Sequence, residues 1–129
     1  MACLDTDFMV GLERGVLQAF AKLESLESEG EAVFITAVTV AELYHGAYRA
    51  KNKEQAVTNA DKSLLKFNVL DLDARSARLW GELSYKLKSN SIGDLDLFIA
   101  CISLSHGQKL VTRNAGHFER VPDLKVESW

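Results

Sequence analysis

Three acidic residues, Asp5, Glu42 and Asp96, are the side chains whose type and placement could support chemistry together. Each also has an ordinary structural explanation. Asp5 can cap a helix that follows it, and Asp96 can complement a helix dipole. Glu42 stands three residues after Thr39, which is the spacing of a capping box. If the three carboxylates converge on one cleft, they repel one another and raise a pKa unless a cation lies among them.

The ligand type narrows the identity of such a cation. Carboxylate oxygens without thiolates select a hard ion, so we predict that Asp5, Glu42 and Asp96 hold Mg²⁺, with Mn²⁺ as a possible substitute. Asp94 is a poorer candidate, because residues two apart in a helical turn point about 200° apart. Since it follows Gly93, we expect Asp94 to be a helix N-cap, with at most a role at the rim of the site.

Other catalytic chemistries lack their residues. The three histidines have no zinc-ligand spacing with one another or with the two cysteines. We interpret His45 and His117 as surface or rim residues and His106 as a helix-end residue. Cys3 and Cys101 lie in apolar runs and are expected to be buried free thiols. There is no glycine-rich phosphate loop and no Gly-x-Ser-x-Gly motif.

The elements that must position the carboxylates follow from hydrophobic patterning. Five apolar segments are predicted as strands: Ala2 to Leu4, Ala32 to Ile35, Asn68 to Leu70, Lys109 to Thr112 and Leu124 to Val126. Helical periodicity lies between them, in segments marked by Leu12-Val16-Phe20-Leu23, Val40-Leu43-Tyr44-Ala47, Lys53 to Lys66, Ser76-Leu79-Trp80-Leu83-Leu87 and Leu97 to Leu104. The last of these is apolar nearly all round and should be central. This alternation predicts an α/β fold with a parallel sheet and helices on both faces.

The predicted elements bring the polar residues to one edge of the sheet. Asp5 ends the first strand, and Glu42 is expected in the first turn of the helix after the second strand. Asp96 is expected in the first turn of the helix that precedes the fourth strand, while Thr112 and Asn114 follow that strand directly. Sites in such sheets form beyond the carboxyl ends of the strands. We therefore expect these five residues to share one site.

Length and composition are those of one ordinary globular domain. The 129 residues are 47% hydrophobic and 26% charged, with a single proline and no linker or repeat. The net charge of −3 argues against binding nucleic acid over the whole surface, although an acidic cleft needs only a few basic residues at its rim. No signal peptide or membrane span is apparent, so we predict a cytoplasmic protein.

Four segments resemble the VapC-type PIN-domain ribonucleases in both order and spacing. They are Leu4-Asp5-Thr6-Asp7, Ala41-Glu42-Leu43-Tyr44-His45-Gly46-Ala47, Gly93-Asp94-Leu95-Asp96-Leu97-Phe98-Ile99-Ala100, and Leu110-Val111-Thr112-Arg113-Asn114 followed by His117-Phe118-Glu119-Arg120-Val121-Pro122. The resemblance extends along essentially the whole chain. It implies a single PIN domain over residues 1–129, in which helices enclose a parallel sheet of about five strands in a three-layer α/β/α arrangement.

The resemblance also implies an activity and its partners. RNA phosphodiester bonds would be hydrolysed with a metal ion that lowers the pKa of a bound water and offsets charge on the phosphate. Arg49, Arg113 or Arg120 could contact RNA phosphates, although each is also an ordinary solvated charge. The chain would be the toxin of a toxin–antitoxin pair, restrained by a co-expressed antitoxin that covers the groove, and it would form a homodimer.

The family's site residues fall on particular positions of this sequence. Its metal ligands fall on Asp5, Glu42 and Asp96, and Thr112 would hold a carboxylate or a water. The family's fourth acidic position falls on Asn114, an amide that would hold a second metal more weakly. Asp7 stands where the family often has asparagine. Both departures leave the number of bound ions open.

Two rival functions remain. A haloacid-dehalogenase-like phosphohydrolase is suggested by Asp5-Thr6-Asp7, by Thr36 and by the acidic segment after Gly93. Against it, no predicted strand precedes Gly93 and no segment could form a cap. The second rival is a PIN-like fold that serves only as a binding module. The intact set of three carboxylates argues against this interpretation.

Overall fold

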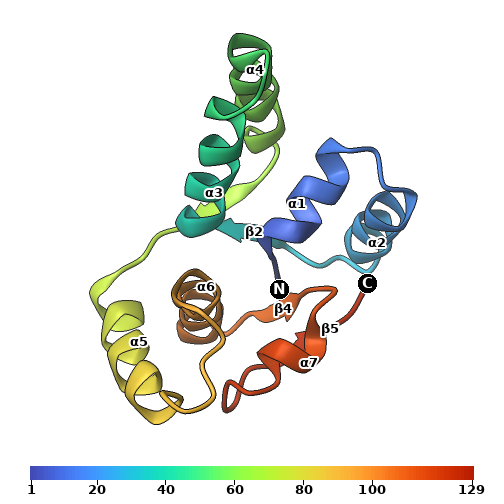
Figure 1. Ribbon diagram of the computed structural model, residues 1–129. Helices are drawn as coiled ribbons and strands as arrows, with labels where there is room; N and C mark the ends of the chain where they lie inside the picture. Colours follow the sequence, from blue (N-terminus) through green and yellow to red (C-terminus); the bar gives the residue numbers. More distant parts are fainter.

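In a computed structural model that describes residues 1–129, a parallel five-stranded sheet lies between helices (Figure 1). The strands are β1 (Ala2–Leu4), β2 (Val33–Thr36), β3 (Asn68–Leu70), β4 (Lys109–Val111) and β5 (Val126–Glu127). The helices are α1 (Thr6–Glu13), α2 (Leu17–Ser28), α3 (Ala37–Tyr48), α4 (Lys53–Leu64), α5 (Ala74–Lys86), α6 (Asp94–Ser105) and α7 (Ala115–Phe118). The predicted three-layer α/β/α fold is confirmed.

The strand order places a natural site at the centre of the sheet. The order is β3-β2-β1-β4-β5, and every neighbouring pair is parallel. The chain therefore builds the sheet outward from β1 in one direction and from β4 in the other. Leu4 pairs with Val111, so the next residues, Asp5 and Thr112, lie side by side at the carboxyl edge. The direction in which strands are added reverses between β1 and β4. Open parallel sheets form their binding sites at such a topological switch point.

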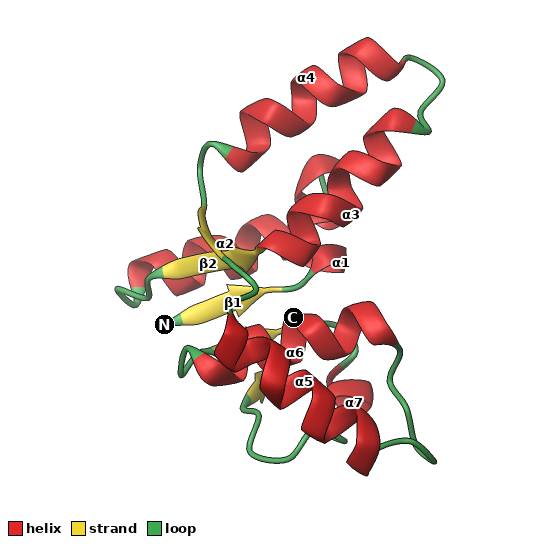
Figure 2. Cartoon of the chain, turned by 90° about the vertical axis from the view of Figure 1, so that its left-hand side faces the viewer, coloured by secondary structure: helices red, strands yellow, loops and turns green.

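Alternating side chains on the strands divide the core into two layers. Ala2, Leu4 and Val111 face a cluster that includes side chains of α1, α2 and α3. Cys3 and Leu110 face the opposite cluster, which includes side chains of α5, α6 and α7. Figure 2 shows these helix groups on the two sides of the sheet, with α4 packed on α3 away from the strands. The period-two pattern of the strands thus accounts for the layers.

The first helical pattern was interpreted wrongly as one continuous buried face. Two helices, α1 and α2, occupy this region, and the chain turns between them at Gly15, where φ is +73°. Val16 is the N-cap of α2 rather than an interior helical residue. Phe20 is 48% exposed, so it does not share the buried face of Leu12 and Leu23. Glycine favours this left-handed conformation because it has no Cβ.

The remaining predicted elements form, with small shifts in their bounds. β2 begins and ends one residue later than predicted, β4 ends one residue earlier, and β5 lies at Val126–Glu127 rather than at 124–126. As expected, α6 is central, and Cys101 on α6 and Cys3 on β1 are buried free thiols. Burial raises the pKa of Cys3 to about 12 and that of Cys101 to about 11. No helix is long and apolar enough to cross a membrane.

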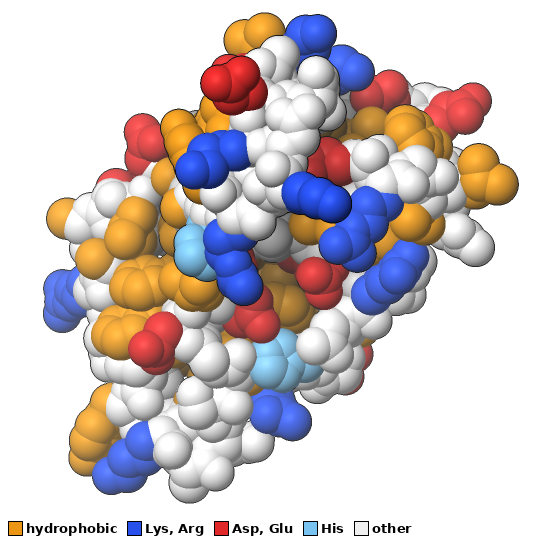
Figure 3. Space-filling view, turned by 45° about the horizontal axis from the view of Figure 1, so that its top comes forward, with side chains coloured by type: hydrophobic (Ala, Val, Ile, Leu, Met, Phe, Trp, Pro, Cys, Tyr) orange, Lys and Arg blue, Asp and Glu red, His pale blue; other side chains and the backbone are white.

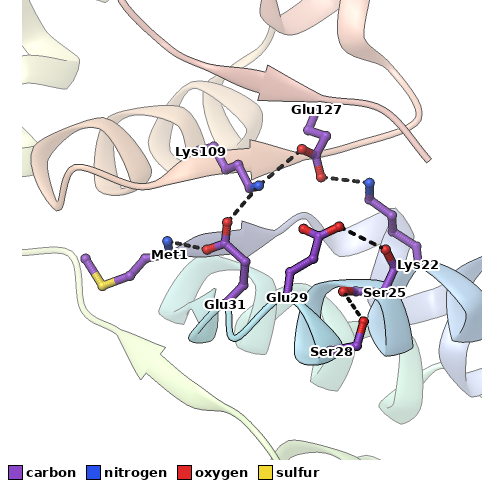
Figure 4. A network of polar contacts seen from close by, with 8 residues as sticks. All are labelled: Met1, Lys22, Ser25, Ser28, Glu29, Glu31, Lys109 and Glu127. Atoms are coloured by element: carbon purple, nitrogen blue, oxygen red, sulfur yellow. Dashed lines mark hydrogen bonds and ion pairs between the residues drawn. The ribbon is translucent and has the colours of Figure 1, made fainter.

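A network of ion pairs joins the amino ends of β1, β2 and β4 to Glu127 at the end of β5 and to α2 (Figure 4). Lys109 at the start of β4 lies 2.9 Å from Glu31 and 3.1 Å from Glu127. Glu31 also pairs with the amino group of Met1, and Glu127 pairs with Lys22 of α2 at 2.7 Å. These contacts tie β1, β4, β5 and α2 together away from the site.

Candidate active site

The predicted carboxylates converge on one cleft of about 150 Å³ at the carboxyl edge of the sheet. Its lining residues are Asp5, Thr6, Asp7, Glu42, Asp96, Asn114 and Phe118. Figure 3 shows acidic side chains in a hollow near the centre of the view, with a histidine and several Lys and Arg side chains around it. Four of the five predicted site residues thus line one cleft, and the fifth, Thr112, is fully buried beside it.

Asp5 joins the end of β1 to the start of α1. It is the N-cap of α1, and its Oδ1 accepts a hydrogen bond from the Phe8 amide at 2.9 Å. Burial raises the pKa of Asp5 to about 6; hydrogen bonds from Thr112 and Phe8 oppose this rise, and the charges of Asp7 and Asp96 add to it. Asp5 therefore caps α1 and also lines the cleft, so the two placements do not exclude each other.

Thr112 and Asn114 support the site from the end of β4. The Thr112 side chain forms a hydrogen bond with Asp5 and also accepts one from the Asn114 amide at 3.0 Å. This contact fixes the turn that brings Asn114, the N-cap of α7, to the cleft. The Thr112 side chain therefore connects Asp5 at the end of β1 with Asn114 at the start of α7.

Glu42 is placed by a chain of threonine hydroxyls rather than by a capping box. Thr36 caps α3 and accepts from the Thr39 amide, so the helix starts earlier than predicted and Glu42 falls in its second turn. The Thr6 hydroxyl donates to Glu42 Oε1 at 2.7 Å and lies 3.1 Å from the Thr39 hydroxyl. Because the Thr6 proton goes to Glu42, Thr39 donates to Thr6. Glu42 Oε2 has no protein donor.

Asp96 lies in the first turn of α6, as predicted, and its Oδ2 lies 3.1 Å from Nε2 of His117. Burial raises the pKa of Asp96 and Asp7 adds to the rise, while His117 opposes it. Oδ1 has no protein donor. The N-cap of this helix is Gly93 and not Asp94, which corrects the sequence interpretation; Asp94 is the first helical residue and is exposed.

The donor set fits a hard cation, although the side chains do not form a closed cage. No three acidic, histidine or cysteine side chains lie close enough to surround one ion. Mg²⁺ usually keeps several waters and binds through one or two carboxylates, so an open cleft with unpartnered oxygens on Glu42 and Asp96 suits it. Burial, and in smaller part the charge of Asp7, raises the pKa of both Asp5 and Asp96, and a nearby positive charge would oppose this rise.

Lys and Arg side chains lie around this cleft. Two of the three arginines that were considered for contacts with RNA phosphates make other contacts. The Arg113 guanidinium stacks 4.0 Å from the ring centroid of Trp129, and Arg120 donates to the Ser91 carbonyl at 3.4 Å. A second groove of about 630 Å³ between α1, α3 and α4 shares Glu42 with the cleft and includes Arg14 and Lys62 in its lining. Arg49 is an exposed residue at the end of α3.

Sequence reasoning missed three residues that form or support the site. Thr6 was quoted only as part of a motif, Phe118 was not considered for the cleft, and His117 was interpreted as a surface or rim residue. The contact between His117 and Asp96 joins residues 21 apart in different helices, which no local spacing reveals. His45 is exposed and His106 is the C-cap of α6, as expected.

The structure argues against a haloacid-dehalogenase-like phosphohydrolase, because a strand that this fold requires is missing. The segment before Gly93 follows α5 and contains no strand, so its acidic residues do not follow a strand as that interpretation requires. Thr36 is occupied as the N-cap of α3.

Comparison with known proteins identifies the family of this chain. The PIN domain family matches residues 2–124. Ribonuclease VapC2 of Rickettsia felis is 31% identical, covering 98% of this chain and 96% of the relative. The tRNA(fMet)-specific endonuclease VapC of Salmonella typhimurium is 31% identical over 74% of each chain. The crystal structure of VapBC2 from Rickettsia felis bound to a promoter DNA fragment superimposes with a TM-score of 0.89 at 30% identity, covering 99% of this chain and 98% of that one. The chain therefore belongs to the PIN-domain family and is of the VapC type.

Proposed function

We propose that this protein is a Mg²⁺-dependent endoribonuclease, with Mn²⁺ as a possible substitute, and that it is the toxin of a VapBC-type pair. The observation that carries the proposal is the convergence of Asp5, Glu42 and Asp96 on one cleft at the switch point of the sheet. Relatives named ribonuclease and tRNA-specific endonuclease support RNA as the substrate class.

Each side chain at the cleft would have a separate role in hydrolysis. Glu42 and Asp96 each have one oxygen held by a protein donor and one oxygen available to a ligand. The Asn114 side chain can accept a hydrogen bond from water without adding charge, while Thr112 keeps Asp5 oriented. A bound divalent cation would act as a Lewis acid that promotes attack by water and offsets charge developing on the phosphate.

Asp96→Asn and Asp94→Asn form a matched test of this proposal. Both residues lie in the first turn of α6, but only Asp96 lines the cleft. We expect Asp96→Asn to reduce Mg²⁺-dependent cleavage of single-stranded RNA by orders of magnitude, because it removes a charge that the cation needs. Asp94→Asn should alter cleavage far less. Excess EDTA should abolish the activity of the unmodified protein.

Thermal denaturation without metal separates catalysis from stability. Since burial raises the pKa of Asp96, removing its charge should leave the midpoint unchanged or raise it. Equal losses of cleavage in both variants would contradict the assignment of Asp96, and cleavage that persists in EDTA would contradict the metal dependence. A protein that binds RNA but never cleaves it would instead be a PIN-like binding module.

An antitoxin segment is the proposed partner of the groove between α1, α3 and α4. Because this groove and the cleft share Glu42, a chain that fills the groove can also cover the carboxylates. Relatives were crystallised as VapBC complexes, which supports a protein partner. Gly46 lines the groove with open space beside its Cα, so Gly46→Phe should weaken binding of the co-expressed antitoxin. Gly81→Phe, on α5 and equally open, is the control.

A homodimer is the second assembly that we propose. Several large apolar side chains are exposed, most fully Leu65, Leu17 and Tyr85, and a partner subunit could cover part of this surface. Light scattering of the purified protein at tens of micromolar should give the mass of two chains. A mass of one chain at every concentration would contradict the proposal.

A further inference from the structure

His117 contacts both Asp96 of the site and the loop that precedes α6. Its Nε2 lies 2.9 Å from the Ile92 carbonyl oxygen and 3.1 Å from Asp96 Oδ2. A carbonyl and an ionised carboxylate only accept hydrogen bonds, so Nε2 carries a proton and donates it. The ring of His117 also packs edge-on against Phe118, with centroids 5.3 Å apart. The histidine is therefore held from two sides.

The anchor of this contact is the backbone of the loop before α6. The Ile92 side chain is buried in the core, and the His117 ring spans from its carbonyl to the carboxylate four residues later. Asp96 is 43% exposed, so without this donor its side chain would have several rotamers available. The contact occupies Oδ2 and leaves Oδ1 without a protein donor.

We propose that His117 is a positioning residue that orients Asp96 for a divalent cation. This inference rests on the proposed metal-dependent function. His117 does not line the cleft, so it acts through Asp96 and not by contact with the substrate. Donors that orient a ligating carboxylate restrict its geometry before the metal binds, and their loss typically lowers metal affinity or activity by roughly 10- to 100-fold.

Two variants of similar bulk isolate the donor. His117→Leu fills the space but has no N–H, whereas His117→Gln supplies an amide N–H. His45→Ala, at an exposed position on α3, is the control. Calorimetric titration of the RNA-free proteins with Mn²⁺ should show a Kd raised roughly 10- to 100-fold for His117→Leu. His117→Gln should recover most of the affinity, and His45→Ala should bind as the unmodified protein does.

Cleavage assays give a second, independent measurement. His117→Leu should need more Mn²⁺ for half-maximal cleavage while its KM for RNA at saturating metal stays unchanged. If His117 only supports the fold, the thermal midpoint would fall while the Mn²⁺ affinity of the folded protein stayed the same, and this result would overturn the inference. Should His117→Leu not fold, the smaller His117→Ala serves in its place.

The outcomes also separate this inference from the proposed function. If the unmodified protein binds Mn²⁺ and cleaves RNA while His117→Leu has wild-type affinity, only the role of His117 is wrong. If the unmodified protein neither binds Mn²⁺ nor cleaves RNA, the proposed function fails and the role of His117 fails with it.

Discussion

Replacing Asp5 by asparagine should stabilise the metal-free protein at alkaline pH. Asp5 is only 5% exposed, and burial is the main reason that its pKa rises from 3.8 to about 6. The charges of Asp7 and Asp96 add to this rise. Asparagine keeps an oxygen that can accept from the Phe8 amide, but it carries no charge into the cleft. The substitution therefore removes an electrostatic cost without removing the helix cap.

The pKa shift of Asp5 determines the sign and the size of the change in unfolding free energy. Because the folded protein holds the Asp5 proton more tightly than the unfolded chain does, the associated stability is present below pH about 4. It is lost as the pH rises through about 6. A shift from 3.8 to about 6 corresponds to about 3 kcal/mol at pH 8, which is an upper limit for the gain on substitution. We expect a gain of about 1 to 3 kcal/mol, since the Asn amide fits the Thr112 contact less well.

Urea denaturation in EDTA at pH 4, 6 and 8, followed by circular dichroism, measures this difference. The advantage of Asp5→Asn should be largest at pH 8 and should disappear at pH 4, whereas Asp71→Asn, at an exposed position, should show no such trend. Added Mg²⁺ should stabilise the unmodified protein but not Asp5→Asn, because a ligand that binds only the folded state raises its stability. The reasoning is refuted if Asp5→Asn is the less stable protein at pH 8, or if its advantage is independent of pH.

Two further predictions concern the start of α6 and the ion-pair network of Figure 4. Gly93→Ala should destabilise the fold by about 1 to 3 kcal/mol and slow RNA cleavage, because Gly93 has φ +92° and ψ 151°. Gly81→Ala, inside α5 with open space around it, should instead stabilise by up to about 1 kcal/mol in the same denaturation assay. Lys109→Met should lower the thermal midpoint slightly at pH 7, and less so in high salt, because Lys109 pairs with Glu31 and Glu127 near the surface. The two glutamates have a lowered pKa, so their contribution is present above their unfolded pKa and should be lost as the pH falls through the folded values.

Much of the fold was predictable because the strands are short apolar runs that alternate with helices. β1 and β3 were predicted at their observed bounds, and the edge that gathers Asp5, Asp96 and Asn114 followed from the order of elements alone. The break between α1 and α2 was missed because Leu12, Val16, Phe20 and Leu23 keep helical spacing across it. A positive φ at a single glycine interrupts the helix without changing that spacing.

The placement of individual site residues was harder to predict than their convergence. Glu42 was expected in the first turn of its helix, but Thr36 caps α3 early and Glu42 reaches Thr6 on α1 instead. His117 on α7 contacts Asp96 on α6. Both contacts depend on how α1, α3, α6 and α7 pack around the sheet, and hydrophobic periodicity carries no information about such packing.

Each of the three carboxylates at the cleft has one oxygen that is held by a neighbouring hydrogen-bond donor. Each accepts a hydrogen bond from a donor that its own surroundings supply: the Phe8 amide for Asp5, the Thr6 hydroxyl for Glu42 and the His117 ring for Asp96. These donors orient the carboxylates and offset part of the cost of burying them. They do not offset this cost fully, because burial, with a smaller contribution from neighbouring acidic charges, still raises the pKa of Asp5 and that of Asp96. In the proposed function, these three donors would hold the carboxylates in place before the metal binds, and a divalent cation would offset the remaining cost of their charge.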